Sequence, residues 1–216
     1  MPILNYMIAA LAAMAAGIIN ALAGGGTLIT FPTLLAIGLA PISANVTSST
    51  ALCPGFLGGT LAQKEDLKDQ KKRLLIVIPA AVLGGLTGAI LLLQTAEKLF
   101  SNLVPFMILL ASALLAVQIP LRKWLIRRQE HASARPIPEA LIFLPIFLCA
   151  IYGGYFGAGM SVIVLALLGL LLNDSLTRLN ALKQTIAFST NLTAALLFIF
   201  SGKSRERSTA IVNEMT

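Results

Sequence analysis

The stretch that decides the fold is ALAGGGTLITFPTLLAIGLAP, residues 21–41, in which three consecutive glycines interrupt a long apolar run. Glycine loses the most conformational freedom on folding and weakens a helix, so three in succession predict a break. The apolar run before the break, Ile3–Ala23, is long enough to cross a bilayer. The run after it, Thr27–Leu39, would be roughly 20 Å long as a helix, against an apolar membrane core of about 30 Å. We therefore expect a half-helix or re-entrant element that begins at Thr27.

The composition indicates an integral membrane protein. Of the 216 residues, 57% are hydrophobic and only 12% are charged, whereas a soluble domain carries about 25% charged residues. Two further runs, Leu74–Leu93 and Leu103–Leu121, are predicted to span, and Ile137–Tyr155 and Leu176–Ser201 nearly reach the required length. The predicted fold is an all-α, multi-pass transmembrane helical bundle with two related repeats and glycine-broken or re-entrant helices.

The positive charge is concentrated in two short segments. The net charge is +7, and ten of the sixteen basic residues lie in Lys64–Arg73 and Arg122–Arg135. Basic loops of this kind face the cytoplasm in membrane proteins. We expect both segments to be cytoplasmic loops of a protein in the inner (plasma) membrane, in contact with membrane lipid and not with nucleic acid.

No pattern in the sequence indicates catalysis or a cofactor. The cysteines Cys53 and Cys149 lie in apolar segments without a CxxC partner, and the single histidine, His131, lies in a basic segment. A metal site or a membrane-embedded hydrolase would need a cluster of such residues. We expect no metal, no cofactor and no enzymatic activity.

A weaker copy of the glycine break occurs in the second half. Gly153-Gly154 and Gly157-Ala158-Gly159 are followed by Met160–Leu172, which is again too short to span. Two glycine-interrupted apolar segments in matching places are typical of the binding site of a secondary transporter. The alternative is that the glycines only allow helices to pack closely. The expected organisation is a first membrane repeat (1–121), a basic cytoplasmic loop (122–136), a second, incomplete repeat (137–202) and a polar tail (203–216).

Helix N-termini beside the two breaks would attract an anion. Free N–H groups at Thr27 and at Met160-Ser161 carry partial positive charge. Lys183 adds an ammonium group within an apolar helix, where ionisable residues are usually functional. The alternative is that Lys183 lies near the interface and extends to the headgroups. Arg178 is expected to anchor the helix at the interface or to pair with Asp174.

Polar residues recur at helical spacing around Lys183 and in the first half. Asn180, Lys183, Gln184, Ala187 and Asn191 fall largely on one helix face. Asn45, Ser48 and Ser49 hold comparable places, from which they could hydrogen-bond an oxyanion from the other side. Equally, the hydroxyl groups could bond to carbonyl groups of their own helix.

Two packing features are also expected. Gly84, Gly85 and Gly88 should form a small-residue contact face. Pro54, with the glycines that follow it, should mark a second irregular stretch.

The glycine-rich and polar segments of the two halves resemble those of a family, the TauE/SafE sulfite and organosulfonate exporters. The first-half pattern is Gly24-Gly25-Gly26-Thr27, then Pro32, Leu34, Gly38 and Pro41, then Ala44 with a Thr/Ser cluster; the second-half pattern is Gly154, Gly157 and Gly159, then Asn180-Ala181-Leu182-Lys183, Asn191, Phe198 and Gly202. The resemblance covers about residues 10 to 202. The second copy reads Gly-Ala-Gly where the family commonly has three glycines, and family members usually continue past the position of Gly202 with two more helices.

The resemblance implies a permease or exporter of small anions such as sulfite, sulfoacetate or other organosulfonates. The alternative is a truncated, non-transporting fragment or an assembly subunit, in which a homo-oligomer could replace the missing packing surface. The candidate substrate-binding residues are Gly24, Gly25, Gly26, Thr27, Asn45, Ser48, Ser49, Gly157, Gly159, Asn180, Lys183 and Asn191.

Overall fold

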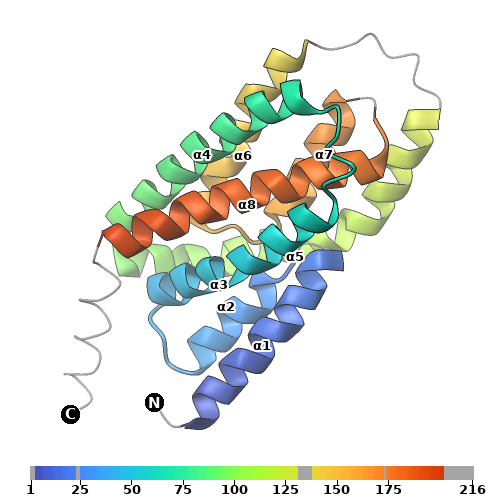
Figure 1. Ribbon diagram of the computed structural model, residues 1–216. Helices are drawn as coiled ribbons and strands as arrows, with labels where there is room; N and C mark the ends of the chain where they lie inside the picture. Colours follow the sequence, from blue (N-terminus) through green and yellow to red (C-terminus); the bar gives the residue numbers. More distant parts are fainter. Residues whose placement is uncertain (1–2, 23–24, 131–137, 173, 202–216) are drawn as a thin grey trace.

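A computed structural model describes residues 3–22, 25–130, 138–172 and 174–201. Within these ranges the chain forms helices and no strand (Figure 1). The helices are α1 (Ile3–Leu22), α2 (Thr27–Ala36), α3 (Pro41–Ala62), α4 (Lys71–Gln94), α5 (Glu97–Glu130), a 3₁₀ turn (Glu139–Ile142), α6 (Phe143–Tyr155), α7 (Met160–Leu171) and α8 (Leu176–Phe200). Among the described helices, α1, α4 and α5 are long and apolar enough to cross a membrane. The predicted all-α membrane bundle is confirmed.

The helices α1 and α2 form an antiparallel N-terminal hairpin. Gly26, at the start of α2, lies against Ala16 near the end of α1, and Ala9 near the start of α1 packs in the same cluster as Leu34 and Leu35 of α2. α2 has ten residues and ends at Ala36, so it is the short helix that the sequence predicts. In Figure 1 the two helices lie side by side.

The helices α6 and α7 form the matching C-terminal hairpin. The hydroxyl group of Tyr152, near the end of α6, donates a hydrogen bond to the carbonyl of Ala158 in the connection between α6 and α7 (2.6 Å). α7 has 12 residues and begins at Met160, as predicted. α6 is also short, with 13 residues preceded by the 3₁₀ turn. With that turn, the apolar helical run extends over Glu139–Tyr155 and stays below the length of the candidate spans, in line with the expectation that Ile137–Tyr155 only nearly reaches it; residue 137 lies outside the described part.

The two hairpins enter the bundle from opposite ends. The C-terminal hairpin begins and returns near Arg73 at the start of α4, because Arg73 bonds both Glu139 before α6 and Asp174 after α7. We call this the basic end. α2 instead leads into α3 at the other end, where the Ile42 N–H donates to Glu97 at the start of α5 (2.9 Å). We call this the Glu97 end. Inverted hairpins of this kind characterise many secondary transporters.

The tightest packing joins α4, α6 and α8. A Cβ atom at Gly84 or Gly88 would clash with backbone atoms of α6, and one at Gly85 would lie 2.8 Å from the Thr190 carbonyl of α8. The expected contact face on α4 is confirmed. The missing side chains allow the helix backbones to approach closely, which supplies the van der Waals contact that holds membrane helices together.

Two expected irregular segments are helical. α3 continues unbroken through Pro54, so the predicted second irregular stretch is wrong. In an apolar environment the backbone has no water to bond with, which favours continuing the helix around a proline. α5 likewise continues to Glu130, so the first residues of the expected loop 122–136 are helical. They are rich in arginine, lysine, leucine and glutamine, which favour helix.

Candidate functional site

The first break is a place of close backbone approach. Gly26 has ordinary helical dihedrals (φ −55°), but a Cβ on it would lie 2.7 Å from the Ala16 carbonyl and 3.0 Å from Leu52 of α3. Thr27 follows as the first residue of α2, as predicted, and is buried. The glycine is thus required for room and not for an unusual backbone conformation. Gly24 lies outside the described residues.

The second break depends on backbone conformation. Gly157 and Gly159 have φ of +81° and +76°, in the left-handed region that other residues rarely adopt. The Met160 N–H donates to the Gly157 carbonyl (3.2 Å). At the first break, the Leu28 N–H similarly donates to the Gly25 carbonyl (3.1 Å). The expectation of a free amide at Met160 is therefore wrong, because the tight turn uses that N–H internally.

Both breaks rest on one turn of α5. A Cβ on Gly25 would lie 2.6 Å from Leu115, and one on Gly159 would lie 3.2 Å from Leu114. The rings of Phe31 on α2 and Phe156 in the second break also meet edge to face, with centroids 5.4 Å apart. The fold therefore brings the two interruptions into one region, although apolar side chains fill the contacts between them.

The first-half polar residues connect these breaks. Ser48 is fully buried and its hydroxyl group bonds that of Thr30 on α2. The Asn45 amide donates to the Tyr155 carbonyl just before the second break (2.9 Å), while its Oδ1 has no hydrogen-bond partner. Ser49 is also buried. A cavity of about 130 Å³ lies between α1, α2 and α3, and Thr30 and Ser48 are among the residues that line it.

The second-half polar residues lie along α8. Asn180 donates to the Gln63 side chain at the end of α3 (3.0 Å), and Asn191 donates to the Ala187 carbonyl of its own helix (2.8 Å). Lys183 is only 4% exposed. Among the described residues, no carboxylate lies within 4.0 Å of its ammonium group. Arg122 on α5 is near enough for its charge to act on Lys183.

The fold separates the polar residues of α3, which include Asn45, from those of α8, which include Lys183. α3 and α8 run antiparallel, with Gly59 against Gln184 and Gln63 bonded to Asn180. Asn45 lies 14 residues (59 − 45) from Gly59 along α3, about 21 Å at 1.5 Å per residue. In this structure one small anion therefore cannot contact both Asn45 and Lys183, contrary to the expectation of opposed groups around a single anion.

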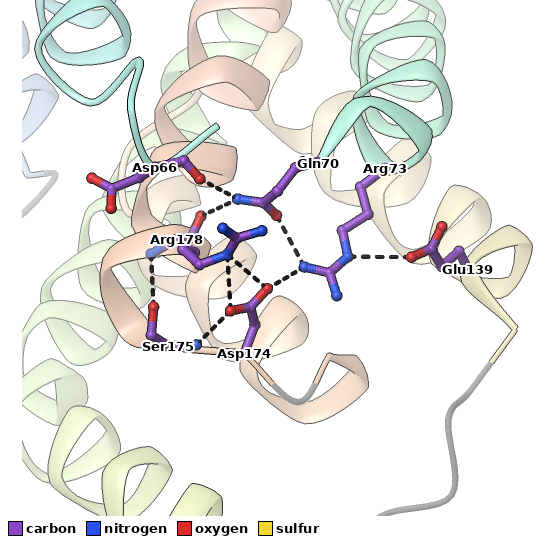
Figure 2. A network of polar contacts seen from close by, with 7 residues as sticks. All are labelled: Asp66, Gln70, Arg73, Glu139, Asp174, Ser175 and Arg178. Atoms are coloured by element: carbon purple, nitrogen blue, oxygen red, sulfur yellow. Dashed lines mark hydrogen bonds and ion pairs between the residues drawn. The ribbon is translucent and has the colours of Figure 1, made fainter. Parts of the chain in front are cut away.

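A polar network covers the basic end of α8 (Figure 2). Asp174 accepts hydrogen bonds from Arg73 of α4, from the Ser175 N–H (2.8 Å) and from Nε of Arg178 on α8 (3.1 Å). Burial raises the pKa of Asp174, but the hydrogen bonds and the charge of Arg178 outweigh it and leave the pKa below its usual value. The predicted pairing of Arg178 with Asp174 is confirmed.

Comparison with known proteins identifies the family of this chain. The model of the family described as sulfite exporter TauE/SafE matches residues 9–212. This chain belongs to the TauE/SafE family. A probable membrane transporter protein of Escherichia coli (strain K12), YfcA, is 26% identical over 195 residues, which is 88% of this chain and 69% of that protein. A probable membrane transporter protein of Haemophilus influenzae is 28% identical over 188 residues, 87% of this chain and 71% of that protein. No solved structure matches the chain.

For this TauE/SafE member, the candidate binding residues chosen from the sequence leave out three contributors to the site, of which only Gln184 was placed on the predicted polar face. Thr30 bonds Ser48, Gln63 bonds Asn180, and the buried amide of Gln184 lies at Gly59 with its Oε1 unpartnered. Gln184 belongs to the polar stripe around Lys183, so its spacing was a usable signal. Thr30 and Gln63 lie on other helices, and only the packing shows their contacts.

Proposed function

We propose that this TauE/SafE protein is a secondary transporter, and not an enzyme, that moves small anions such as sulfite, sulfoacetate or other organosulfonates across the inner membrane. The substrate would bind at Lys183, with Asn180 and Gln184 beside it. The family relationship supports the membrane-transporter class. The single observation that supports an anionic substrate is the environment of Lys183.

Lys183 differs from the basic residues that have structural partners. Lys68, Arg73 and Arg178 each form an ion pair, whereas Lys183 is buried without a carboxylate among the described residues. Burying an unpaired ammonium group costs several kcal/mol even after relaxation. A bound anion would remove most of that cost, so the site favours an oxyanion over a neutral solute.

The inverted hairpins support transport over simple binding. Asn45 and Ser48 lie near the Glu97 end of α3, and Asn180 and Lys183 lie near the basic end of α8. Pro41 and Leu176 begin these helices, so Asn45 matches Asn180 and Ser48 matches Lys183 in helix position. Two polar groups related in this way, one toward each end, suit a carrier that exposes its substrate to the two sides in turn. Surrounding lipid, and a homo-oligomer if one forms, would cover the exposed apolar faces.

The test is flux of labelled sulfite into proteoliposomes. We expect Lys183→Met to reduce flux to the level of empty liposomes, because the substrate's counter-charge is removed. Lys98→Met is the matched control, since Lys98 is exposed beside Glu97 at the other end. Lys183→Arg should retain part of the activity because it keeps the charge.

The proposal has a clear contrary outcome. If Lys183→Met inserts normally and transports sulfite at the wild-type rate, Lys183 is not part of an anion site. If the wild-type chain moves neither sulfite nor any organosulfonate, the proposed substrate class is wrong.

A further inference from the structure

The network at the basic end contains two guanidinium groups that converge on one carboxylate. Arg73 reaches Asp174 from α4 and Arg178 reaches it from the first turn of α8, as Figure 2 shows. The side chains of Arg73 and Asp174 are 18% and 16% exposed, and that of Arg178 is 31% exposed. Paired guanidinium groups recognise carboxylate, phosphate and similar oxyanions through the same planar donors.

The guanidinium of Arg73 and the backbone of Arg178 are held in place by contacts besides those to Asp174. Arg73 also donates to Glu139 (3.4 Å) and to the Gln70 side chain (3.0 Å). Gln70 is itself bound to the carbonyl groups of Asp66 (2.7 Å) and Arg178 (3.3 Å). Ser175 caps α8 by accepting from the Arg178 N–H. A displaced Asp174 would therefore leave the held guanidinium of Arg73, and beside it that of Arg178, at the N-terminus of a 25-residue helix, where the helix dipole adds positive potential.

This pair lies closer to the basic end of α8 than Lys183 does. Arg178 precedes Lys183 by five residues on α8 (183 − 178), about 7.5 Å along the helix axis. Between them Asn180 bonds Gln63 across to α3. Arg73 and Arg178 therefore lie nearer the basic end of the bundle than the Lys183 ammonium group does.

We propose that Arg73 and Arg178 form an entry site for the oxyanion substrate, and that Asp174 occupies it as a tethered anion until the substrate displaces it. This rests on the proposed function for the identity of the anion. The exchange replaces one negative group by another between the same donors, so neither guanidinium is left buried and unpaired. Asp174 lies on the connection between α7 and α8, and its release would free that connection from α4.

The experiment measures anion binding in a chain in which Lys183 is replaced, so that the result does not depend on transport. In the full chain carrying Lys183→Met, the midpoint of thermal unfolding is followed against ethanesulfonate concentration at constant ionic strength, with chloride as the other anion. Adding Asp174→Asn should lower the half-saturating concentration at least tenfold, because the internal competitor is neutralised. Adding Arg178→Gln to that chain should abolish the gain.

A second comparison covers the case in which the Asp174 variant does not fold. With Asp174 intact, Arg178→Gln should raise the half-saturating concentration of ethanesulfonate at least tenfold relative to Lys183→Met alone. Equal binding with and without Asp174→Asn, or binding that Arg178→Gln leaves unchanged, would overturn the proposal. Either result leaves the anion site at Lys183 untouched, because the sulfite flux of Lys183→Met relative to that of the wild-type chain tests that site separately.

Discussion

The N-terminal and C-terminal hairpins have the same outline and different packing. The C-terminal hairpin is packed through α6 against the glycines of α4, and Arg73 holds both of its ends. The N-terminal hairpin encloses a cavity of about 130 Å³ against α3, and most of the large apolar side chains of α1 are exposed. The difference indicates that α4, α6 and α8 form the rigid part of the bundle and that α1 and α2 are the less constrained part.

The largest expected effect tests the rigid part. A Cβ on Gly88 of α4 would meet backbone atoms of Ile151 and Tyr155, which cannot move without shifting α6. Gly88→Ala should therefore destabilise the protein by about 1–3 kcal/mol, measured as a lower midpoint of thermal unfolding in detergent. Gly17→Ala on α1 is the matched control, because nothing lies within 4 Å of its added Cβ. Equal midpoints for the two variants would show that α4 and α6 are not tightly packed.

The next effect tests why each break needs glycine: for its backbone conformation at Gly159, and for room at Gly26. At Gly159, φ is +76°, a conformation that costs most residues about 1–2 kcal/mol and that asparagine tolerates better. Both Gly159→Asn and Gly159→Ala place a Cβ 3.2 Å from Leu114, so they share that cost. Gly159→Asn should be the more stable of the two because it tolerates the positive φ, in the same unfolding measurement. At Gly26 asparagine should be no better than alanine, because the obstacle there is the Ala16 carbonyl 2.7 Å away. The same order of stability at both positions would contradict the distinction.

The smallest effect should be a gain of stability in the N-terminal hairpin. Ala12 lines the cavity between α1, α2 and α3, and leucine is a good helix former that would occupy part of the space. Ala12→Leu should stabilise the chain by about 0.5–2 kcal/mol, whereas Ala15→Leu, at an exposed position of α1, should change little. A loss of stability on filling the cavity would show that this hairpin is as closely packed as the other.

The sequence by itself determined the elements that depend on neighbouring residues. The glycine runs predicted both breaks, and the lengths of the apolar runs predicted the short α2 and α7. The spacing of Asn180, Lys183 and Gln184 placed them on one helix. Each of these follows from local conformational freedom and from the length of an apolar run. The N–H of Met160 was wrongly predicted to be free, because it donates a hydrogen bond within the turn that the left-handed glycines form.

Only the tertiary structure decided how these elements meet. The antiparallel pairing of α3 and α8 separates Asn45 from Lys183, and the opposite entry of the hairpins brings Gly25 and Gly159 to one turn of α5. The bond between Arg73 and Asp174 joins residues 101 positions apart. Such contacts depend on how whole helices pack against one another, and no pattern of neighbouring residues specifies that packing.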